Sequence, residues 1–546
     1  MKKILLLTFY LSLSCLAYAQ FSGKGAGTEK DPYQITNVDE LFEINGDLSA
    51  HYLLMNDIDM TEWVAENSPS MGWMPIGSSV TPFTGHLKGN NHSIKGLFIN
   101  RSGASYIGLF GYVNGGAIEH VALVNPNVSG LSAVGCVAGY VTGTGYKGQA
   151  GSTQGTLNQV VVINGKVNAK ENMAGGLVGH IVKGTVSGCY CAASVTGYSS
   201  VGGLCGEEGG HIYWDGNIYN WGYRHIPTEI TDNFFDGRVV GKNNIGGIVG
   251  HVNKIEGDYY EGTWHDITCQ RNVVKGTIQG ESDYVGGLTG GMNTNNTDKM
   301  DVDATVFKIS DNVIVLDSVI SITSTPYRVG WWVSNNNYVL GTMMVMAKGR
   351  PLSVDDDIRN GTGFGKKTLM RQATYEGLGF NFNKLWTIQE DMTYPYGINQ
   401  GDIPKISEFV SGNKGYIKGT TSAGTGVVNA MIGDSYYSSY VVDGRWEIVI
   451  GTVNQGSQAS ISVTPNGKAP SPIAYATAEE KAPVELRLGD ANGDGIIDSA
   501  DITALVNAIL NKPSATFIKE NADINGDGLI LIDDVSLLVE IIINAE

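Results

Sequence analysis

A glycine-rich phrase that recurs six times restricts the fold of this chain more than any other feature. Each copy combines glycines with aliphatic residues and closes on a glycine; the copies are 107–111, 135–139, 175–179, 202–206, 246–250 and 286–290. The closing glycines are 28, 40, 27, 44 and 40 residues apart, which indicates a short unit with insertions of variable length. Because so short a unit cannot bury its own apolar face, neighbouring units must stack. The spacing therefore predicts a solenoid.

A second repeated element alternates with the glycine phrase. Its copies begin with an apolar residue and span 118–121, 157–160, 186–189, 230–233, 267–270 and 309–312. Such short segments, rich in β-branched residues and bounded by Gly and Asn, favour strands over helices. We expect two or three strands per turn in a parallel β-solenoid. The glycines are expected to adopt positive φ at corners and to let successive coils approach closely.

The phrase Gly-Gly-Leu-x-Gly, as at 175–179, resembles the GLUG motif of secreted bacterial repeat proteins. The resemblance covers about residues 30–410 and implies a right-handed parallel β-helix in a mainly β protein. It implies little about activity, because the family includes adhesin-like proteins, regions that flank proteases and members without an assigned role. We expect the coils over 106–410 and a lead-in over 20–105, with a capping helix at 37–45. Aromatic residues at 379–396 are expected to seal the other end.

The first nineteen residues predict a cleaved secretory signal peptide. A basic start, an apolar run from Ile4 to Leu16 and an Ala-Tyr-Ala site precede Gln20. Cys15 also allows a lipoprotein signal, although Ser12 stands where that signal has Leu. No later stretch has the length and hydrophobicity of a transmembrane helix. The net charge of −18 argues against nucleic acid or an anionic membrane as partner. The expected location is therefore secreted or cell-surface.

An odd number of cysteines remains after the expected signal: Cys136, Cys189, Cys191, Cys205 and Cys269. Their spacing fits no metal site. We interpret them as small apolar residues of the coil interior. A disulfide in the exported protein is the alternative.

Two insertions that follow consecutive glycine phrases, at 207–229 and 253–266, are rich in aromatic residues. The candidate ligand-binding residues are Tyr213, Trp214, Tyr219, Trp221, Tyr223, Tyr259, Tyr260 and Trp264. Because neighbouring strands lie about 4.8 Å apart, insertions that leave the same point of consecutive coils should lie side by side. Rings beside carboxylates such as Glu207, Glu208, Asp215, Asp258 and Glu261 suit a sugar-binding surface. Alternatively, the aromatic residues pack on one another and on the solenoid wall.

The sequence pattern changes after the solenoid. Strand-like segments recur at intervals of about ten residues over 411–468, which predicts a small Ig-like β-sandwich that serves as a spacer. The Ala- and Pro-rich stretch 469–487 is expected to be a linker.

Two twelve-residue stretches near the C-terminus have the spacing of calcium loops. The first offers Asp490, Asn492, Asp494, Asp498, Asp501 and the carbonyl of Ile496, and the second offers Asp523, Asn525, Asp527, Asp534 and the carbonyl of Leu529. Glycine stands at the sharp bend of each loop. Leu531 occupies the ninth position of the second loop, where the first has Asp498. The sequence predicts two Ca²⁺ sites, of which the second is weaker.

Asp at the last loop position, no helix entering each loop and an amphipathic helix leaving each loop resemble a type I dockerin. The resemblance covers residues 488–546 and implies an α-helical calcium-binding module that docks to a cohesin-type partner. It places Ser499, Ala500, Ile532 and Asp533 at the recognition positions. The same fold also fits a metal-stabilised end cap.

We therefore expect a secreted or cell-surface binding protein whose β-helix presents a glycan- or surface-binding face. No catalytic triad, zinc motif or recurring row of acids points to an enzyme. The alternative is a polysaccharide lyase or glycoside hydrolase within a dockerin–cohesin assembly. Its candidate catalytic groups lie in the aromatic insertions: Asp215, Glu256, Asp258, Glu261 and His265.

Overall fold

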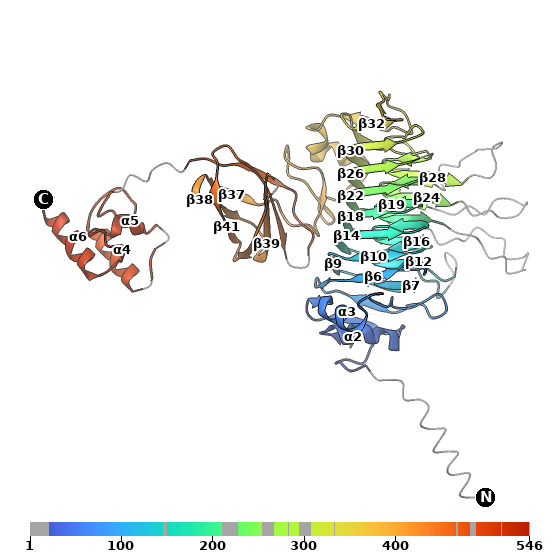
Figure 1. Ribbon diagram of the computed structural model, residues 1–546, viewed down its shortest axis with the longest axis horizontal. Coiled ribbons are helices and arrows are strands. Elements are labelled where there is room, and N and C mark those ends of the chain that lie inside the picture. Colours follow the sequence, from blue (N-terminus) through green and yellow to red (C-terminus); the bar gives the residue numbers. More distant parts are fainter. Residues whose placement is uncertain are drawn as a thin grey trace, which may run out of the picture.

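The computed structural model describes most of the chain after residue 20. The described ranges are 21–145, 150–209, 228–253, 267–281, 283–293, 307–331, 333–433, 435–465, 468–480, 487–510, 512–514 and 516–544. The protein is mainly β, and its largest part is a stack of coils built from long parallel sheets (Figure 1). Among the described residues, no helix has the length and hydrophobicity needed to cross a bilayer.

Four sheets run along the stack. The nine-stranded sheet contains β1 (Tyr33–Ile35), β2 (His51–Leu54), β4 (His86–Lys88), β8 (Ala117–Glu119), β13 (Gly155–Asn158), β17 (Gly184–Ser187), β21 (Thr228–Thr231), β25 (Ile267–Gln270) and β29 (Phe307–Ser310). The six-stranded sheet contains β7 (Phe110–Asn114), β12 (Ala138–Thr142), β16 (Val178–Val182), β20 (Cys205–Glu208), β24 (Val249–Asn253) and β28 (Thr289–Asn293). The five-stranded sheet contains β11 (Val134–Gly135), β15 (Asn172–Gly175), β19 (Ser199–Gly202), β23 (Asn243–Gly246) and β27 (Val285–Gly286).

The fourteen-stranded sheet is the longest. Its main path contains β3 (Ile58–Asp59), β5 (Ser93–Lys95), β9 (Ala122–Val124), β14 (Val161–Ala169), β18 (Tyr190–Thr196), β22 (Phe234–Gly241), β26 (Val273–Gly280), β30 (Val313–Ser321), β31 (Tyr338–Leu340) and β34 (Thr362–Phe364). Beside the path lie β6 (Phe98–Arg101), β10 (Asn127–Gly130), β32 (Met344–Ala347) and β33 (Arg350–Pro351). A turn such as β13–β14–β15–β16 visits all four sheets, whereas the repeats predict two or three strands per turn.

The glycine phrases stack as their spacing predicts. Phe110, Ala138, Val178, Cys205, Val249 and Thr289 pair in one parallel register, which aligns the closing glycines that follow them. This register forms a parallel β-helix-like core from the aliphatic residues of every coil.

The closing glycines let the backbones of neighbouring coils approach closely, and they do not adopt a positive φ. None of them has a positive φ; the left-handed corners are taken by non-glycine residues such as Ala133, Met173 and Ser200. A Cβ on Gly250 would lie 2.3 Å from the nitrogen of Val201 and 2.5 Å from the carbonyl carbon of Ser200 in the coil before it. The expectation of positive φ at these glycines is therefore wrong, and the expectation of close packing is confirmed.

The second repeated element also stacks, with one correction. Leu157 pairs with Ile118 and Val186, but Ile230 pairs with Cys269 rather than with Ile267. The true fifth copy therefore begins two residues later, at Cys269. This register places Asn272 between Asn233 and Asn312.

A ladder of buried asparagines closes this turn of the coils. Asn233, Asn272, Asn312 and Asn337 are at most 2% exposed. Nδ2 of Asn272 donates to the carbonyl of Ile230 at 2.8 Å and to Oδ1 of Asn312 at 3.0 Å. Oδ1 of Asn272 accepts from the main-chain nitrogen of Asn233 at 3.1 Å. The side chains thus satisfy main-chain groups that the corner leaves without strand partners.

Replacement of Asn272 by Leu is expected to destabilise the coils by about 2 kcal/mol, because buried donors and acceptors on both neighbouring coils lose their partner. Denaturant unfolding followed by circular dichroism measures the change. The matched control is Asn168→Ala, which removes an exposed amide from β14 and should change the unfolding free energy by less than about 0.5 kcal/mol. Equal midpoints for the two variants would contradict the role of the ladder.

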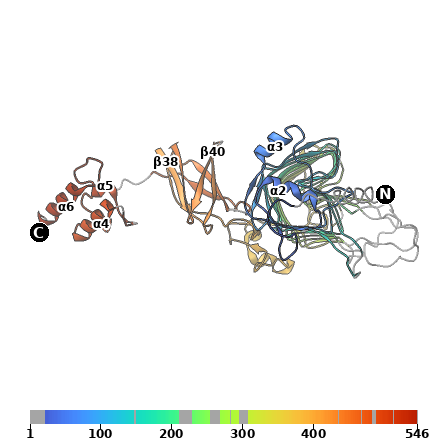
Figure 2. The same cartoon turned by 90° about the horizontal axis from the view of Figure 1, so that it is seen from below.

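Two helices lie at the N-terminal end of the stack. They are α2 (Val38–Phe42), which continues into the 3₁₀ turn η1 (Glu43–Gly46), and α3 (Thr61–Asn67). Figure 2 looks along the stack and shows α2 and α3 across this end. Asn37 begins α2 as its N-cap, because its side chain accepts from the nitrogen of Glu40 at 3.0 Å.

The segment after the last coil packs on the side of the stack and does not seal its end. It contains η2 (Thr368–Met370), η3 (Gln372–Leu378), β35 (Trp386–Thr387) and β36 (Tyr396–Gly397). Its aromatic and aliphatic side chains cover an apolar row on the outside of the fourteen-stranded sheet, which includes Tyr190 and Phe234. Nε1 of Trp386 donates to Oδ1 of Asp232 at 3.1 Å. The outer row is apolar in sequence because this returning segment buries it.

A seven-stranded antiparallel sheet follows. Its strands are β37 (Lys405–Val410), β38 (Gly412–Thr420), β39 (Thr425–Ile432), β40 (Ser435–Val442), β41 (Arg445–Val453), β42 (Gln458–Pro465) and β43 (Ala474–Thr477), in the order β37-β38-β41-β40-β39-β42-β43. One core joins the three-stranded half β37-β38-β41 to the four-stranded half β40-β39-β42-β43. Because β43 pairs with β42, the stretch 469–487 is not wholly a linker. Its alternating Ala474 and Ala476 fit a strand despite the nearby prolines.

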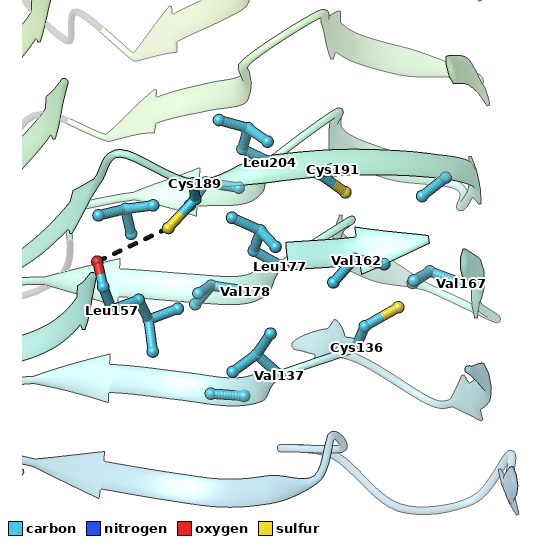
Figure 3. Close-up of a cluster of buried hydrophobic side chains, with 14 of the residues drawn as sticks. Cys136, Val137, Leu157, Val162, Val167, Leu177, Val178, Cys189, Cys191 and Leu204 are labelled. Atoms are coloured by element: carbon cyan, nitrogen blue, oxygen red, sulfur yellow. Dashed lines mark hydrogen bonds between the residues drawn. The ribbon is translucent and has the colours of Figure 1, made fainter. Parts of the chain in front are cut away.

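The five cysteines are buried free thiols inside the coils, as the filler interpretation predicts. Figure 3 shows Cys136, Cys189 and Cys191 among valine and leucine side chains, with the thiol of Cys189 directed at the carbonyl of Leu157. Burial raises the pKa of Cys189 to about 12 and the pKa of Cys269 to about 12. The positions of the five cysteines therefore reflect side-chain packing in the interior of the coils.

We expect these five thiols not to react with a thiol reagent in the native protein at about pH 8. Their raised pKa keeps the thiolate fraction low, and burial keeps the reagent away. All five should react once the coils are unfolded in denaturant, as counted by the released chromophore. Rapid labelling of the native protein at any of these positions would contradict the packing.

Candidate functional site

The C-terminal loops are held by three helices with a small shared core. The helices are α4 (Ser499–Ile509), α5 (Lys519–Ala522) and α6 (Ile532–Asn544). Ala491, Ala504, Leu505, Ala522 and Leu538 form the core between them. The leaving helices α4 and α6 are confirmed, but α5 ends directly before Asp523. The expectation that no helix enters either loop is therefore wrong for the second loop.

The first loop is folded around its own carboxylates. Oδ2 of Asp490 accepts from the nitrogen of Gly495 at 3.0 Å, and Oδ1 of Asp494 accepts from the nitrogen of Ile496 at 2.8 Å. Asp501, fully buried, accepts from the nitrogens of Asn492 and Asp498, both at 2.9 Å. These contacts fix the main chain of the loop around its carboxylates.

The second loop repeats the same hydrogen bonds at the equivalent positions. Oδ2 of Asp523 accepts from Gly528, Oδ1 of Asp527 accepts from Leu529, and the fully buried Asp534 accepts from Asn525 and Leu531. In both loops the third- and fifth-position side chains also bond each other, Asn492 with Asp494 and Asn525 with Asp527. The duplication thus extends from sequence to hydrogen bonding.

One carboxylate oxygen in each loop is buried without a protein partner. Oδ1 of Asp490 and Oδ1 of Asp523 are buried and have no hydrogen-bond partner. A buried carboxylate oxygen without a partner is costly, and a bound cation removes that cost. Among the described residues, no three His, Cys, Asp or Glu side chains converge closely enough to hold a metal by themselves. A hard cation here would therefore also need the amide and main-chain oxygens, which Ca²⁺ accepts.

The two loops differ at the ninth position. Asp498 is the N-cap of α4, and its Oδ1 accepts from the nitrogen of Ala500 at 2.6 Å. Leu531 stands at the equivalent position before α6 and is 43% exposed. The second loop therefore lacks both the side-chain oxygen and the helix cap that Asp498 gives the first loop.

The four expected partner-binding residues begin the two long helices. Ser499 and Ala500 are the first residues of α4, and Ile532 and Asp533 are the first residues of α6. All four are exposed, and Ile532 is 69% exposed. An exposed isoleucine beside an ion site is available to a protein partner.

The aromatic ligand-binding candidates lie outside the described residues. This holds for Tyr213, Trp214, Tyr219, Trp221, Tyr223, Tyr259, Tyr260 and Trp264, and for Asp215, Glu256, Asp258, Glu261 and His265. The strands from which the two insertions leave are described. Glu208 of β20 pairs with Val252 of β24, so the two insertions leave neighbouring strands at equivalent points.

A row of polar and aromatic residues runs across the six-stranded sheet at this base. Tyr112, Tyr140, His180, Glu207 and His251 are in register on consecutive strands. The rings of Tyr112 and Tyr140 stack with centroids 4.5 Å apart, and Nδ1 of His251 lies 3.4 Å from Oε2 of Glu207. This row is absent from the sites predicted from the sequence. Its signal is present, because each member directly follows a closing glycine.

Glu207 is the carboxylate of this row. Burial acts to raise its pKa, but contact with His251 and the nearby His180 outweigh burial and hold the pKa below its ordinary value. Its Oε2 also accepts from the hydroxyl of Ser200 at 3.1 Å. Glu207 is therefore ionised and fixed in position at the root of the insertions.

Two curated relatives match parts of the chain. A protein of Evansella cellulosilytica described as a Gly-rich membrane protein is 31% identical over 163 residues, which are 27% of this chain and 18% of the relative. Halomucin of Haloquadratum walsbyi is 32% identical over 250 residues, which are 42% of this chain and 3% of halomucin. The chain thus spans less than a fifth of either relative.

A solved structure also resembles part of the chain. It is described as an immunoglobulin A1 protease from Bacteroides ovatus and is 18% identical, with a TM-score of 0.43. The match covers 68% of this chain and 94% of that chain. The likeness is too low to support an inference about fold or activity.

The C-terminal end matches a family model. Residues 488–542 match the model of the dockerin type I domain. Domains of this kind bind calcium and dock to cohesin partners, and the proteins that carry them are typically extracellular or on the cell surface. The family match and the duplicated loops together identify residues 488–542 as a type I dockerin domain.

Proposed function

We propose that this chain is an exported binding protein that a calcium-loaded dockerin fastens to a cohesin-type partner. In this proposal, residues 1–19 are a cleaved signal peptide and the coils form a right-handed β-helix of the GLUG type. The seven-stranded sheet is an Ig-like spacer. The β-helix presents a glycan- or surface-binding face formed by the two aromatic insertions.

The pair of buried carboxylate oxygens without partners, on Asp490 and Asp523, carries this proposal. Two such oxygens at equivalent positions support two Ca²⁺ sites. Asp490, Asn492, Asp494, Asp498, Asp501 and the carbonyl of Ile496 would hold the first ion, and Asp523, Asn525, Asp527, Asp534 and the carbonyl of Leu529 the second. Ser499, Ala500, Ile532 and Asp533 would contact the partner.

Capture by an immobilised panel of cohesin modules tests the proposed binding of the dockerin to a cohesin. The full chain should be captured in Ca²⁺, released by chelator and recaptured when Ca²⁺ is restored. Ile532→Asp should abolish capture without changing calcium binding, because Ile532 is exposed and supplies no loop ligand. Capture that survives chelation would contradict the proposal.

The equivalent departure of both insertions from β20 and β24 supports a shared binding face. A glycan array probed with the full chain, beside a reducing-sugar release assay on the same glycans, tests this face. Binding without release, lost in the Trp214→Ala, Trp264→Ala variant, supports a binding role. Retention of binding in that variant would contradict the role of the insertions.

The second candidate function is a glycan-degrading one, favoured by the row of His180, Glu207 and His251 at the base of the insertions. A fixed carboxylate between two histidines supplies charged and proton-transferring groups at one place. Release of reducing sugar that is lost in Glu207→Gln or Asp258→Ala would establish this function instead. Activity unchanged in both variants would exclude these carboxylates.

A further inference from the structure

The four-stranded half of the seven-stranded sheet is free of charge. Strands β40, β39, β42 and β43 contain no Asp, Glu, Lys, Arg or His, although the whole chain has 54 acidic and 36 basic residues. Exposed sheet faces ordinarily carry charged side chains, which keep them soluble and prevent unwanted association. An uncharged face in so acidic a chain therefore needs a reason.

The three-stranded half of the same unit does carry charged side chains. Its strands carry Lys405, Glu408, Lys414, Lys418, Arg445 and Glu447. Nζ of Lys418 lies 2.9 Å from Oε1 of Glu408, and the two residues form an exposed ion pair. The two halves share one core and similar strand lengths, so the difference in charge does not follow from the fold.

Tyrosines stand exposed on the uncharged face. Tyr440 of β40 is 78% exposed and Tyr475 of β43 is 74% exposed. Tyr440 lies opposite Val427, and Tyr475 lies opposite Ser460, which in turn lies opposite Met431. The tyrosines are thus three strands and four residues apart. With strands about 4.8 Å apart and a rise of about 3.3 Å per residue, the diagonal is roughly 20 Å.

Small polar side chains occupy the space between the tyrosines. Asn429 lies opposite Ser438 on one side and Ser462 on the other, in the row midway between Val427 and Met431. At the far edge, Nε2 of Gln458 donates to the hydroxyl of Thr477 at 2.8 Å. The described side chains of this face thus combine the rings of Tyr440 and Tyr475 with neutral hydroxyl and amide groups, and the row between the two rings, Ser438, Asn429 and Ser462, carries only short side chains.

We propose that this face binds a neutral polysaccharide, with Tyr440 and Tyr475 stacked on separate sugar rings and the row of Ser438, Asn429 and Ser462 bonded to hydroxyls between them. Sugar rings present apolar faces to aromatic rings and hydroxyls to neutral polar groups. The absence of charge on this face favours an uncharged ligand, because an ionic ligand would lose its hydration and gain no opposite charge here. This site lies outside the aromatic insertions and is independent of them.

Affinity electrophoresis of the full chain through gels that contain hydroxyethyl cellulose, galactomannan or mixed-linkage β-glucan tests the proposal, with anionic polygalacturonate for comparison. At least one neutral polymer should retard the protein more than polygalacturonate does. The Tyr440→Ala, Tyr475→Ala variant should bind that polymer about tenfold more weakly or worse. Both side chains are exposed, so the variant should keep the thermal midpoint of the parent chain.

Two controls separate this face from other surfaces. Val449→Ala removes a side chain that is 76% exposed on the opposite half and should leave retardation unchanged. The Trp214→Ala, Trp264→Ala variant measures the contribution of the insertions; retardation that survives in the tyrosine variant and is lost in the tryptophan variant would assign the binding to the insertions and overturn the proposal. No retardation by any of the three neutral polymers would overturn it too. If the tyrosine variant instead converts a dimer to a monomer in sedimentation, the face joins two copies of this chain.

Discussion

Removal of calcium is expected to unfold the α4–α6 unit and to abolish capture by a cohesin, while the coils stay folded. Five buried residues and eight partly buried hydrophobic residues form the core of this unit, which is small enough that a bound metal would add substantially to its stability. Asp490, Asp501 and Asp534 are at most 5% exposed, and without a cation their buried negative charges oppose folding. Ca²⁺ binding is therefore expected to supply much of the folding free energy of this unit.

Calorimetry of the full chain with and without chelator measures this effect. The transition of the C-terminal unit should disappear in chelator and return with Ca²⁺, while the transition of the coils stays within a few degrees. Asp501→Ala should reproduce the loss with Ca²⁺ present, and Asp533→Ala, which removes an exposed carboxylate outside the ligand set, should not. An unchanged transition in chelator would contradict a metal-dependent fold.

A single substitution in the second loop is expected to strengthen Ca²⁺ binding. Leu531→Asp restores both an oxygen ligand and a helix cap, the latter worth about 1 kcal/mol. Titration calorimetry should show tighter Ca²⁺ binding at the second site. Leu529→Asp adds the same charge at a position whose carbonyl, and not its side chain, is the expected ligand, so it should have a much smaller effect. Equal gains from the two variants would assign the effect to net charge alone.

Replacement of Gly250 by Ala is expected to destabilise the coils by about 4 kcal/mol or more, at the extreme of single substitutions. The added Cβ would lie 2.3 Å from a main-chain nitrogen and 2.5 Å from a main-chain carbon. These atoms belong to paired strands of the preceding coil, so no side chain can rotate to relieve the overlap. The coils would have to separate along the stack.

Denaturant unfolding of Gly250→Ala and Gly377→Ala compares a crowded glycine with an open one. A Cβ on Gly377 would meet nothing within 4 Å, and Gly377 has no positive φ, so this control should be neutral or slightly stabilising. Gly179→Ala, where the Cβ would lie 2.2 Å from the carbonyl carbon of Ala133, should behave like Gly250→Ala. A small change in both crowded variants would show that the coils yield easily at their closing glycines.

The sequence predicted the stack of coils and the calcium loops because both depend on local spacing. One closing glycine per coil fixes where backbones meet, and the order of oxygen-bearing side chains in a short loop is set by the loop's own residues. The interior cysteines were also predictable, since most of them occupy positions that apolar residues fill in other coils, and Cys136 stands where the other glycine phrases have glycine. The row that includes Glu207 was visible in principle, as the residue after each closing glycine.

Other features depend on contacts between residues far apart in sequence, and only the tertiary structure decided them. The register that pairs Ile230 with Cys269 depends on which coil stacks on which. The row around Phe234 is buried because a segment about 150 residues later folds back over it, through Trp386 and Asp232. The exposure of Tyr440 and Tyr475 on one uncharged face likewise depends on strand order. Local patterns record the nearest neighbours of each residue, whereas packing of one segment on another depends on the folded chain as a whole.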